Sequence, residues 1–105
     1  MERKLFNPLT RTHTKGVEYC ISQEIINYLW SMIDDLSMIK KIDYLQIFYF
    51  KIKRNNLVIE HRQEVPRYRK KYTFTHLNEV YRYRGLKVYI IDDYDYSIMM
   101  LSSEY

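Results

Sequence analysis

The side chains that could bind a metal or move protons are few, and their spacing matches no known site. His61 lies beside Glu60 and near Glu64, and His76 follows further along the chain. Imidazole and carboxylate groups are zinc ligands, but this spacing fits none of the established ligand patterns. A histidine in an alternating apolar segment more often packs inside a sheet, so we expect His61 to face the same side as Ile59 without binding a metal.

Three aspartates form a second candidate for metal binding. Asp92, Asp93 and Asp95 offer the oxygen ligands that a hard cation prefers. The spacing of an EF-hand loop is absent, and aspartate favours tight turns because its side chain bonds the nearby backbone. We interpret the segment as a turn and expect neither a metal nor any other cofactor.

Nucleophilic catalysis and nucleotide binding have equally little support. Cys20 is the single cysteine, and no histidine base lies near it in the sequence. Gly16 and Gly85 are isolated, so no glycine-rich loop is available to cradle phosphates. We expect a protein that is not an enzyme. One cysteine allows no intramolecular disulfide framework and is compatible with a reducing compartment.

The basic residues are concentrated in the middle of the chain. Residues 46–89 carry a net charge of +8 and the remainder carries −4, within an overall net charge of +4. A field of one sign over one face attracts an oppositely charged partner. The eleven cations of this segment are Lys51, Lys53, Arg54, Arg62, Arg67, Arg69, Lys70, Lys71, Arg82, Arg84 and Lys87.

Tyrosines alternate with cations in two parts of this segment, 68–72 and 81–84. Cations neutralise phosphates and rings stack on unpaired bases, which suits single-stranded nucleic acid. Tyrosine and arginine are also enriched at protein-interface hot spots, and a solvated strand edge with tyrosines under lysine stems has the same composition. All three readings stay open. The candidate partner-binding residues are Arg67, Tyr68, Arg69, Lys70, Lys71, Tyr72, Tyr81, Arg82, Tyr83 and Arg84.

The length of 105 residues predicts one domain, 1–105, with a single core. Lys4 and the charged residues before it are followed by only two apolar residues, so we expect no signal peptide. No apolar run approaches the length that crosses a bilayer, and we expect a cytoplasmic protein.

A helix is the best-defined element. Apolar residues recur at helical spacing over residues 23–36, and Ser22 is in position to cap the first turn. Trp30 widens the apolar stripe, so we expect it to be buried against a sheet. Alternate threonines predict a short strand within 11–17.

Strands are predicted at 43–53, 57–65, 86–91 and 96–101. Pro66 ends the second of these strands or marks a sheet edge, and 67–75 is predicted to be an exposed edge strand or a long loop. A two-residue turn centred on Asn55 and Asn56 would place Lys51 opposite Glu60 and Tyr49 opposite Arg62. The fold class is therefore α+β: a single domain with one main helix packed on an antiparallel sheet of about four to five strands.

Several segments together resemble a known family. They are Thr14-Lys15-Gly16, 29–34 of the helix, Asp43-Tyr44-Leu45-Gln46-Ile47-Phe48, His61-Arg62-Gln63-Glu64-Val65-Pro66, and 91–97 with the tail to Tyr105. This chain resembles the domain of unknown function 960, found in Firmicutes and their phages, although Tyr94 stands where that pattern has glycine. The resemblance implies no catalytic residue or cofactor. It implies a phage or mobile-element setting, in which small proteins often bind and block host machinery.

We therefore expect an inhibitor of the anti-CRISPR kind, which docks its basic face on a host protein or ribonucleoprotein such as a Cas9-like nuclease and can touch nucleic-acid phosphates. A small accessory protein that binds single-stranded DNA or RNA directly is the alternative. A homodimer formed through an exposed strand edge comes third, so the protein is a monomer or a homodimer.

Overall fold

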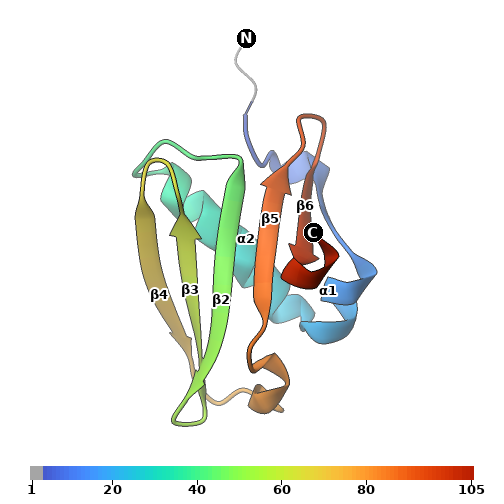
Figure 1. Cartoon of the computed structure of the whole chain (residues 1–105), viewed down its shortest axis with the longest axis vertical. Helices are drawn as coiled ribbons and strands as arrows, with labels where there is room; N and C mark the ends of the chain where they lie inside the picture. The colour runs from blue at the N-terminus through green and yellow to red at the C-terminus, as the bar shows by residue number, and fades with distance from the viewer. Residues whose placement is uncertain (1–3) are drawn as a thin grey trace.

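One helix crosses a six-stranded sheet in the computed structural model, which describes residues 4–105 (Figure 1). The strand order is β1-β6-β5-β2-β3-β4. Residues 1–3, which include the charged Glu2 and Arg3 used in the signal-peptide expectation, lie outside the described residues. The elements are η1 (Pro8–Thr10), β1 (Arg11–His13), α1 (Lys15–Cys20), α2 (Gln23–Ser37), β2 (Leu45–Lys53), β3 (Asn56–Gln63), β4 (Tyr68–Phe74), η2 (Val80–Tyr83), β5 (Lys87–Asp92), β6 (Ser97–Leu101) and η3 (Ser102–Glu104).

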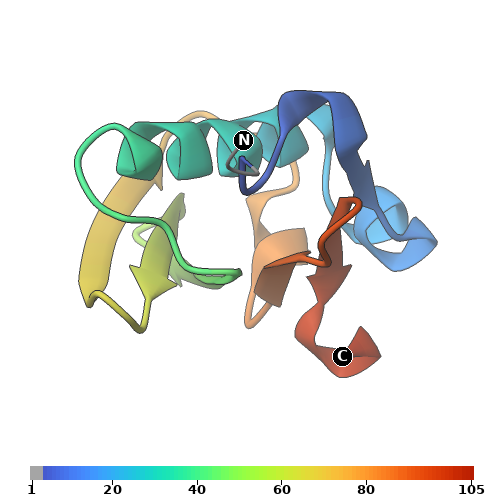
Figure 2. The same ribbon diagram turned by 90° about the horizontal axis from the view of Figure 1, so that it is seen from above.

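The long helix α2 covers one face of the sheet, as the view from above shows (Figure 2). Ser22 Oγ accepts a hydrogen bond of 3.3 Å from the Ile25 amide, which confirms the predicted N-cap. Trp30 is 9 % exposed, and the Arg11 guanidinium lies 5.0 Å from its ring centre. The predicted helix and the burial of Trp30 are both confirmed. The buried apolar stripe of α2 consists of Ile25, Ile26, Leu29, Trp30, Met32, Ile33 and Leu36.

The sheet has more strands than the sequence predicted, and it is mixed rather than purely antiparallel. The short strand β1 pairs in parallel with β6, with Arg11 opposite Ser97. The predicted strand within 11–17 ends at His13, because Thr14 Oγ1 accepts from the Val17 amide at 3.1 Å and begins the helix α1. The alternate threonines were a local signal for this strand, but its parallel pairing with a strand near the far end of the chain has none.

The β2–β3 hairpin forms with a different register from the predicted one. The turn residues are Arg54 and Asn55, whose φ angles are 52° and 64°. Positive φ at both central residues is what a tight hairpin turn requires, and Asn56 instead pairs with Lys53. Tyr49 therefore faces Glu60, not Arg62, and Lys51 faces Val58, not Glu60. Each pairing moves along the strand by two residues, so every side chain keeps its predicted face.

The later elements follow the predictions more closely. The segment predicted as an edge strand or loop at 67–75 forms the edge strand β4 (Tyr68–Phe74), and the segment that includes Asp92 and Asp93 leads through a tight connection into β6. Tyr94, where the family pattern has glycine, has a φ of 62°, in the left-handed region that glycine favours. No helix within residues 4–105 is long and apolar enough to cross a membrane.

Candidate functional site

The side of the sheet away from α2, which we term the open face, carries no long helix (Figures 1 and 2). Side chains alternate along each strand, and those paired in register point to the same side. Helix-side positions such as Phe48, Ile59 and Val88 are fully buried. The pairing register therefore determines which strand side chains lie on the open face.

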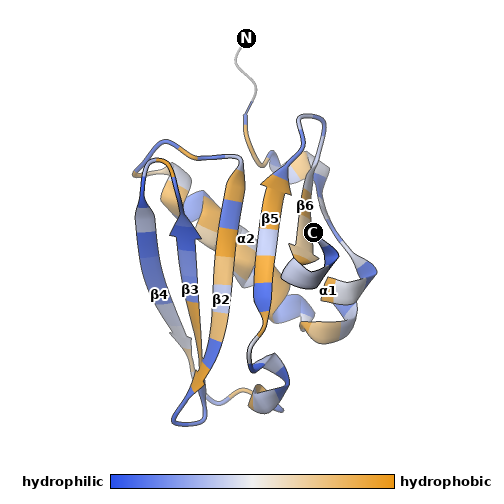
Figure 3. Ribbon diagram, in the orientation of Figure 1, coloured by the Kyte–Doolittle hydropathy of each residue, from blue (hydrophilic) through white to orange (hydrophobic). Residues whose placement is uncertain are grey.

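Strands β3 and β4 are mostly hydrophilic, whereas β2, β5 and β6 contain more hydrophobic residues (Figure 3), and the side chains of the open face divide into an apolar half and a basic half. Half-buried apolar side chains come from β5, β6 and the first part of β2, namely Leu45, Ile47, Tyr89, Ile91, Ile98 and Met100. Cations dominate the other half, and Glu60 is the one acid at the strand positions of this face. These cations are Lys51, Lys53, Arg62, Arg69, Lys71 and Lys87.

Glu60 is held by two arginines of the basic half. Its side chain is 11 % exposed, and its Oε1 accepts a hydrogen bond from Arg62 Nε and lies 3.3 Å from Arg69 Nε. Burial by itself raises the pKa of the Glu60 carboxyl, but the hydrogen bond from Arg62 and the charges of Arg62, Arg69 and Lys71 outweigh it and lower the pKa overall. Glu60 therefore stays ionised and fixes both guanidinium groups through their Nε atoms.

Cations also cover the tyrosine rings of the open face. Tyr49 on β2 lies between Arg62 on β3, 4.5 Å from the ring centre, and Lys87 on β5, at 5.0 Å. Lys87 also lies 5.3 Å from the Tyr89 ring, whose other contact is the Tyr105 ring at 5.3 Å. The Tyr89 and Tyr49 side chains raise the pKa of Lys87, Tyr89 most, so the ammonium stays charged. In the basic half, a partner therefore meets the charged groups of Arg62 and Lys87 before it meets the tyrosine rings beneath them.

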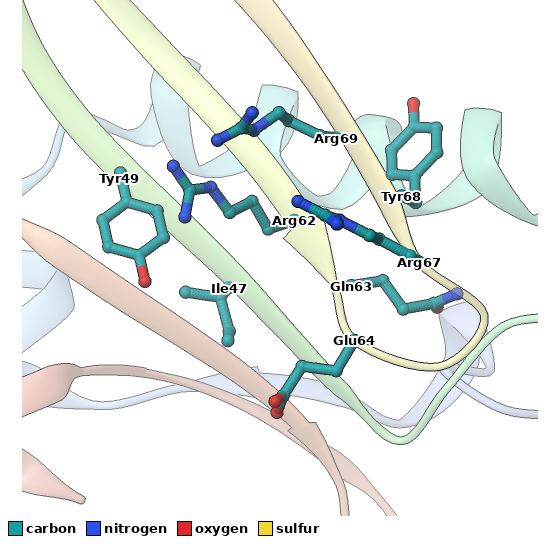
Figure 4. Close-up of a pocket in the computed structure, with 8 residues that line it drawn as sticks. All are labelled: Ile47, Tyr49, Arg62, Gln63, Glu64, Arg67, Tyr68 and Arg69. Atoms are coloured by element: carbon teal, nitrogen blue, oxygen red, sulfur yellow. The ribbon is translucent and has the colours of Figure 1, made fainter.

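A cleft of about 370 Å³ opens at the β3–β4 end of the basic half. Figure 4 shows the guanidinium groups of Arg62, Arg67 and Arg69 gathered on one side, with the Glu64 carboxylate at the opposite end. Ile47 and Tyr49 line the inner wall. The arrangement can bind an anion through several N–H donors at once.

His61 lies on the opposite, helix-covered face and is fully buried. Its Nε2 is 2.6 Å from Gln46 Oε1, and its ring stacks on Phe48 with centres 4.4 Å apart. Burial lowers the pKa of His61 to about 3. Within residues 4–105, no three His, Cys, Asp or Glu side chains are close enough to hold a metal ion.

The ten candidate partner-binding residues are divided among three places. Arg69 and Lys71 lie on the open face, and Arg67 lines its cleft. The other three residues of the 68–72 group, Tyr68, Lys70 and Tyr72, point to the helix side, since they pair with Gln63, His61 and Ile59. Tyr68 also borders the cleft, but it is 9 % exposed and its ring packs edge-on against the buried His61, so it offers little ring surface to a partner.

The 81–84 group lies at the other end of the sheet, in and after η2. Tyr83 is 3 % exposed and packs in the core, while Arg82 Nη2 donates to the Tyr19 carbonyl at 3.1 Å. Tyr81 and Arg84 are exposed, with 5.4 Å between the guanidinium carbon and the ring centre. The two groups therefore do not form one surface.

Sequence reasoning missed the centre of the open face. Tyr49, Arg62 and Lys87 come from three strands that are adjacent only in the sheet. The available signal was alternation, because Tyr49 and Lys51 share a face with Glu60 and Arg62 in any register consistent with the hairpin. Applying this two-residue alternation to both strands of the hairpin would have placed Tyr49 and Arg62 on one face, and would have missed only Lys87 of β5.

Comparison with known proteins identifies the fold but no activity. A sequence model of the family described as "Staphylococcal protein of unknown function (DUF960)" matches residues 10–104. The crystal structure of a protein of unknown function from Enterococcus faecalis is similar, with a TM-score of 0.87 and 17 % sequence identity over 99 % of this chain and 98 % of that chain. No curated protein matches the sequence.

Proposed function

We propose that this chain, which belongs to the family of staphylococcal proteins of unknown function (DUF960), is a non-enzymatic interaction protein that docks through its open face on a host complex acting on nucleic acid. The observation that carries the proposal is the open face itself. Its strand positions include six cations and one carboxylate, Glu60, which is ion-paired with two arginines, and no long helix covers them. An uncovered sheet face of one charge is suited to an anionic partner.

The mixed chemistry of this face supports a macromolecular partner over a small metabolite. Apolar side chains such as Ile47, Ile91 and Met100 lie on the same open face as the cations, spread over β2, β5 and β6. Apolar contacts give affinity, while charges set orientation and the rate of association. This combination suits a large complex with an acidic groove or exposed phosphates.

In the phage-type setting that the family resemblance implied, such docking makes the protein an inhibitor of the anti-CRISPR kind. A Cas9-like nuclease with its guide RNA is a target of the right chemistry, since the phosphates of the guide RNA are anions that a basic face can contact. Cytoplasmic localisation in a bacterial host follows from that target. The alternative, direct binding of single-stranded DNA or RNA through base stacking, ranks second because cations already cover Tyr49 and Tyr89.

Affinity capture from a Firmicute lysate, with and without nuclease treatment, tests the proposal. The double variant Lys51→Glu/Lys71→Glu reverses two open-face charges and should lose the captured complex. The control Lys4→Glu/Lys15→Glu makes the same change at exposed positions outside the sheet strands and should retain it. Capture that is equal for both variants, with unchanged melting temperatures, would remove the open face from the function.

A further inference from the structure

The cleft at the β3–β4 end of the open face has the chemistry of a phosphate site. Arg62, Arg67 and Arg69 converge there beside Ile47 and Tyr49 (Figure 4). We propose that this cleft, with the cations that continue from it, binds the sugar-phosphate backbone of a double-helical nucleic acid without reading its sequence. The inference rests on the proposed function, for which it names the group that the open face contacts in the host complex.

Two of the arginines are already oriented for an anion. Arg62 and Arg69 both approach Glu60 Oε1 through Nε. A guanidinium group has five N–H donors, so four on each arginine lie on its terminal nitrogens. No hydrogen bond from those terminal nitrogens is seen within the described residues. Glu60 therefore acts as a positioning residue, which holds two like charges together and leaves their bidentate ends for a phosphate.

Arg67 supplies a third donor group from the turn before β4. The Arg67 backbone carbonyl accepts a hydrogen bond of 3.2 Å from Lys40 Nζ, which connects the turn to the segment after α2. Figure 4 shows its guanidinium extending toward that of Arg62. Among the described residues its side chain makes no ion pair. Glu64 also lines the cleft, but its carboxylate lies at the far end and points away from the arginines.

The cations continue from the cleft along the sheet. Arg67 in the turn before β4 is followed at alternate positions by Arg69 and Lys71 within the strand, and Lys51 and Lys53 continue toward the hairpin end of β2. An adjoining hollow of about 710 Å³ shares Tyr49 and Arg62 with the cleft and reaches Lys51, Lys53 and Lys71. A row of charges fits a polymer with repeating phosphates better than it fits a single anion, and duplex DNA carries about one charge per 1.7 Å of its axis.

The rings argue for backbone contact over base stacking. Binding of unpaired bases depends on aromatic faces that are free to stack. Tyr49 has a cation on each side, and Tyr89 contacts Lys87 and Tyr105. A base would have to displace those cations, whereas a phosphate would bind to them. A duplex, whose bases are already stacked, loses nothing on such a surface.

Fluorescence anisotropy with labelled duplexes of about 20 base pairs, one DNA and one RNA, and with the matching single strands, tests the inference. We expect the duplexes to bind more tightly than the single strands, with log affinity falling steeply with log salt. Arg67→Gln and Arg69→Gln should each reduce the slope by about 0.9 and weaken binding roughly three- to tenfold at low salt. Lys15→Gln, which removes one charge from α1, should leave the slope unchanged. The DNA and RNA arms show which duplex is preferred.

Three results would overturn the inference. They are tighter binding of the single strands, a salt slope that the two arginine variants leave unchanged, and no duplex binding at all. If the lysate capture then survives nuclease treatment and depends on Lys51 and Lys71, the partner is a protein surface and the proposed function stands without this inference. If the capture also ignores those lysines, both proposals are wrong.

Discussion

We expect the buried His61 to lower the free energy of unfolding of this protein in mild acid. Gln46 Nε2 donates to the Asp43 carbonyl at 2.9 Å and to Gln63 Oε1 at 2.7 Å, so the Gln46 amide oxygen faces the histidine. His61 therefore donates through Nε2, and Nδ1 is the site that would take up a proton. Nδ1 is buried without a hydrogen-bond partner, so a proton there would create an unpaired charge in the core.

The size of the effect follows from the two pKa values. Burial lowers the pKa of His61 from 6.5 to about 3 in the folded protein. Between these values the unfolded chain binds a proton that the folded chain does not, so the free energy of unfolding falls as the pH falls. From pH 7 to pH 5 the loss from this group is about 2 kcal/mol. The pKa of Glu60 is below its ordinary value of 4.5, so that group acts only at lower pH.

Urea unfolding followed by the fluorescence of Trp30, the only tryptophan, measures this dependence at pH 7, 6 and 5. In His61→Gln the side chain can still bond Gln46 but cannot titrate, so the variant should lose most of the pH dependence even if it is less stable at pH 7. His76→Gln changes an exposed histidine and should keep the dependence of the wild type. Equal pH dependence in wild type and His61→Gln, or an NMR titration of His61 with a midpoint above about 5, would refute the reasoning.

Three further predictions concern the fold. Trp30→Ala should lower the free energy of unfolding by about 3 kcal/mol, because it empties a site in the core under Arg11; unchanged stability in urea would contradict the packing of α2 on the sheet. Ser22→Ala should cost about 1 kcal/mol through the lost N-cap of α2, with Ser22→Asp as the control that restores the melting temperature. Treatment with a chelator should leave the melting temperature unchanged, and a drop that one divalent ion reverses would revive a metal site at Asp92, Asp93 and Asp95.

Local patterns in the sequence were sufficient to identify most individual elements. The helix over 23–36, its cap at Ser22 and the burial of Trp30 depend on residues within a few turns of one another. The strands over 43–53 and 86–91 follow from apolar and β-branched runs. The burial of His61 beside Ile59 followed from alternation, because a slip of two residues in the hairpin leaves every side chain on the same face.

The position of the hairpin turn and the parallel strand pair depended on the tertiary structure. Residues 54–56 offer two overlapping turns, and cross-strand packing selects the one with Arg54 and Asn55 at positive φ. The pairing of β1 with β6 joins residues 86 positions apart, Arg11 and Ser97, and no local period encodes it.

By itself the sequence determined that the middle of the chain is basic and rich in tyrosine, because composition and charge need no coordinates. Only the tertiary structure decided which of those residues share a surface. Strand alternation turned Tyr68 and Tyr72 toward the helix, while strand order brought Tyr49, Arg62 and Lys87 together from three strands. The physical reason is that a sheet face is built from every second residue of strands distant in sequence, so neighbours along the chain point apart and neighbours in space are set by register.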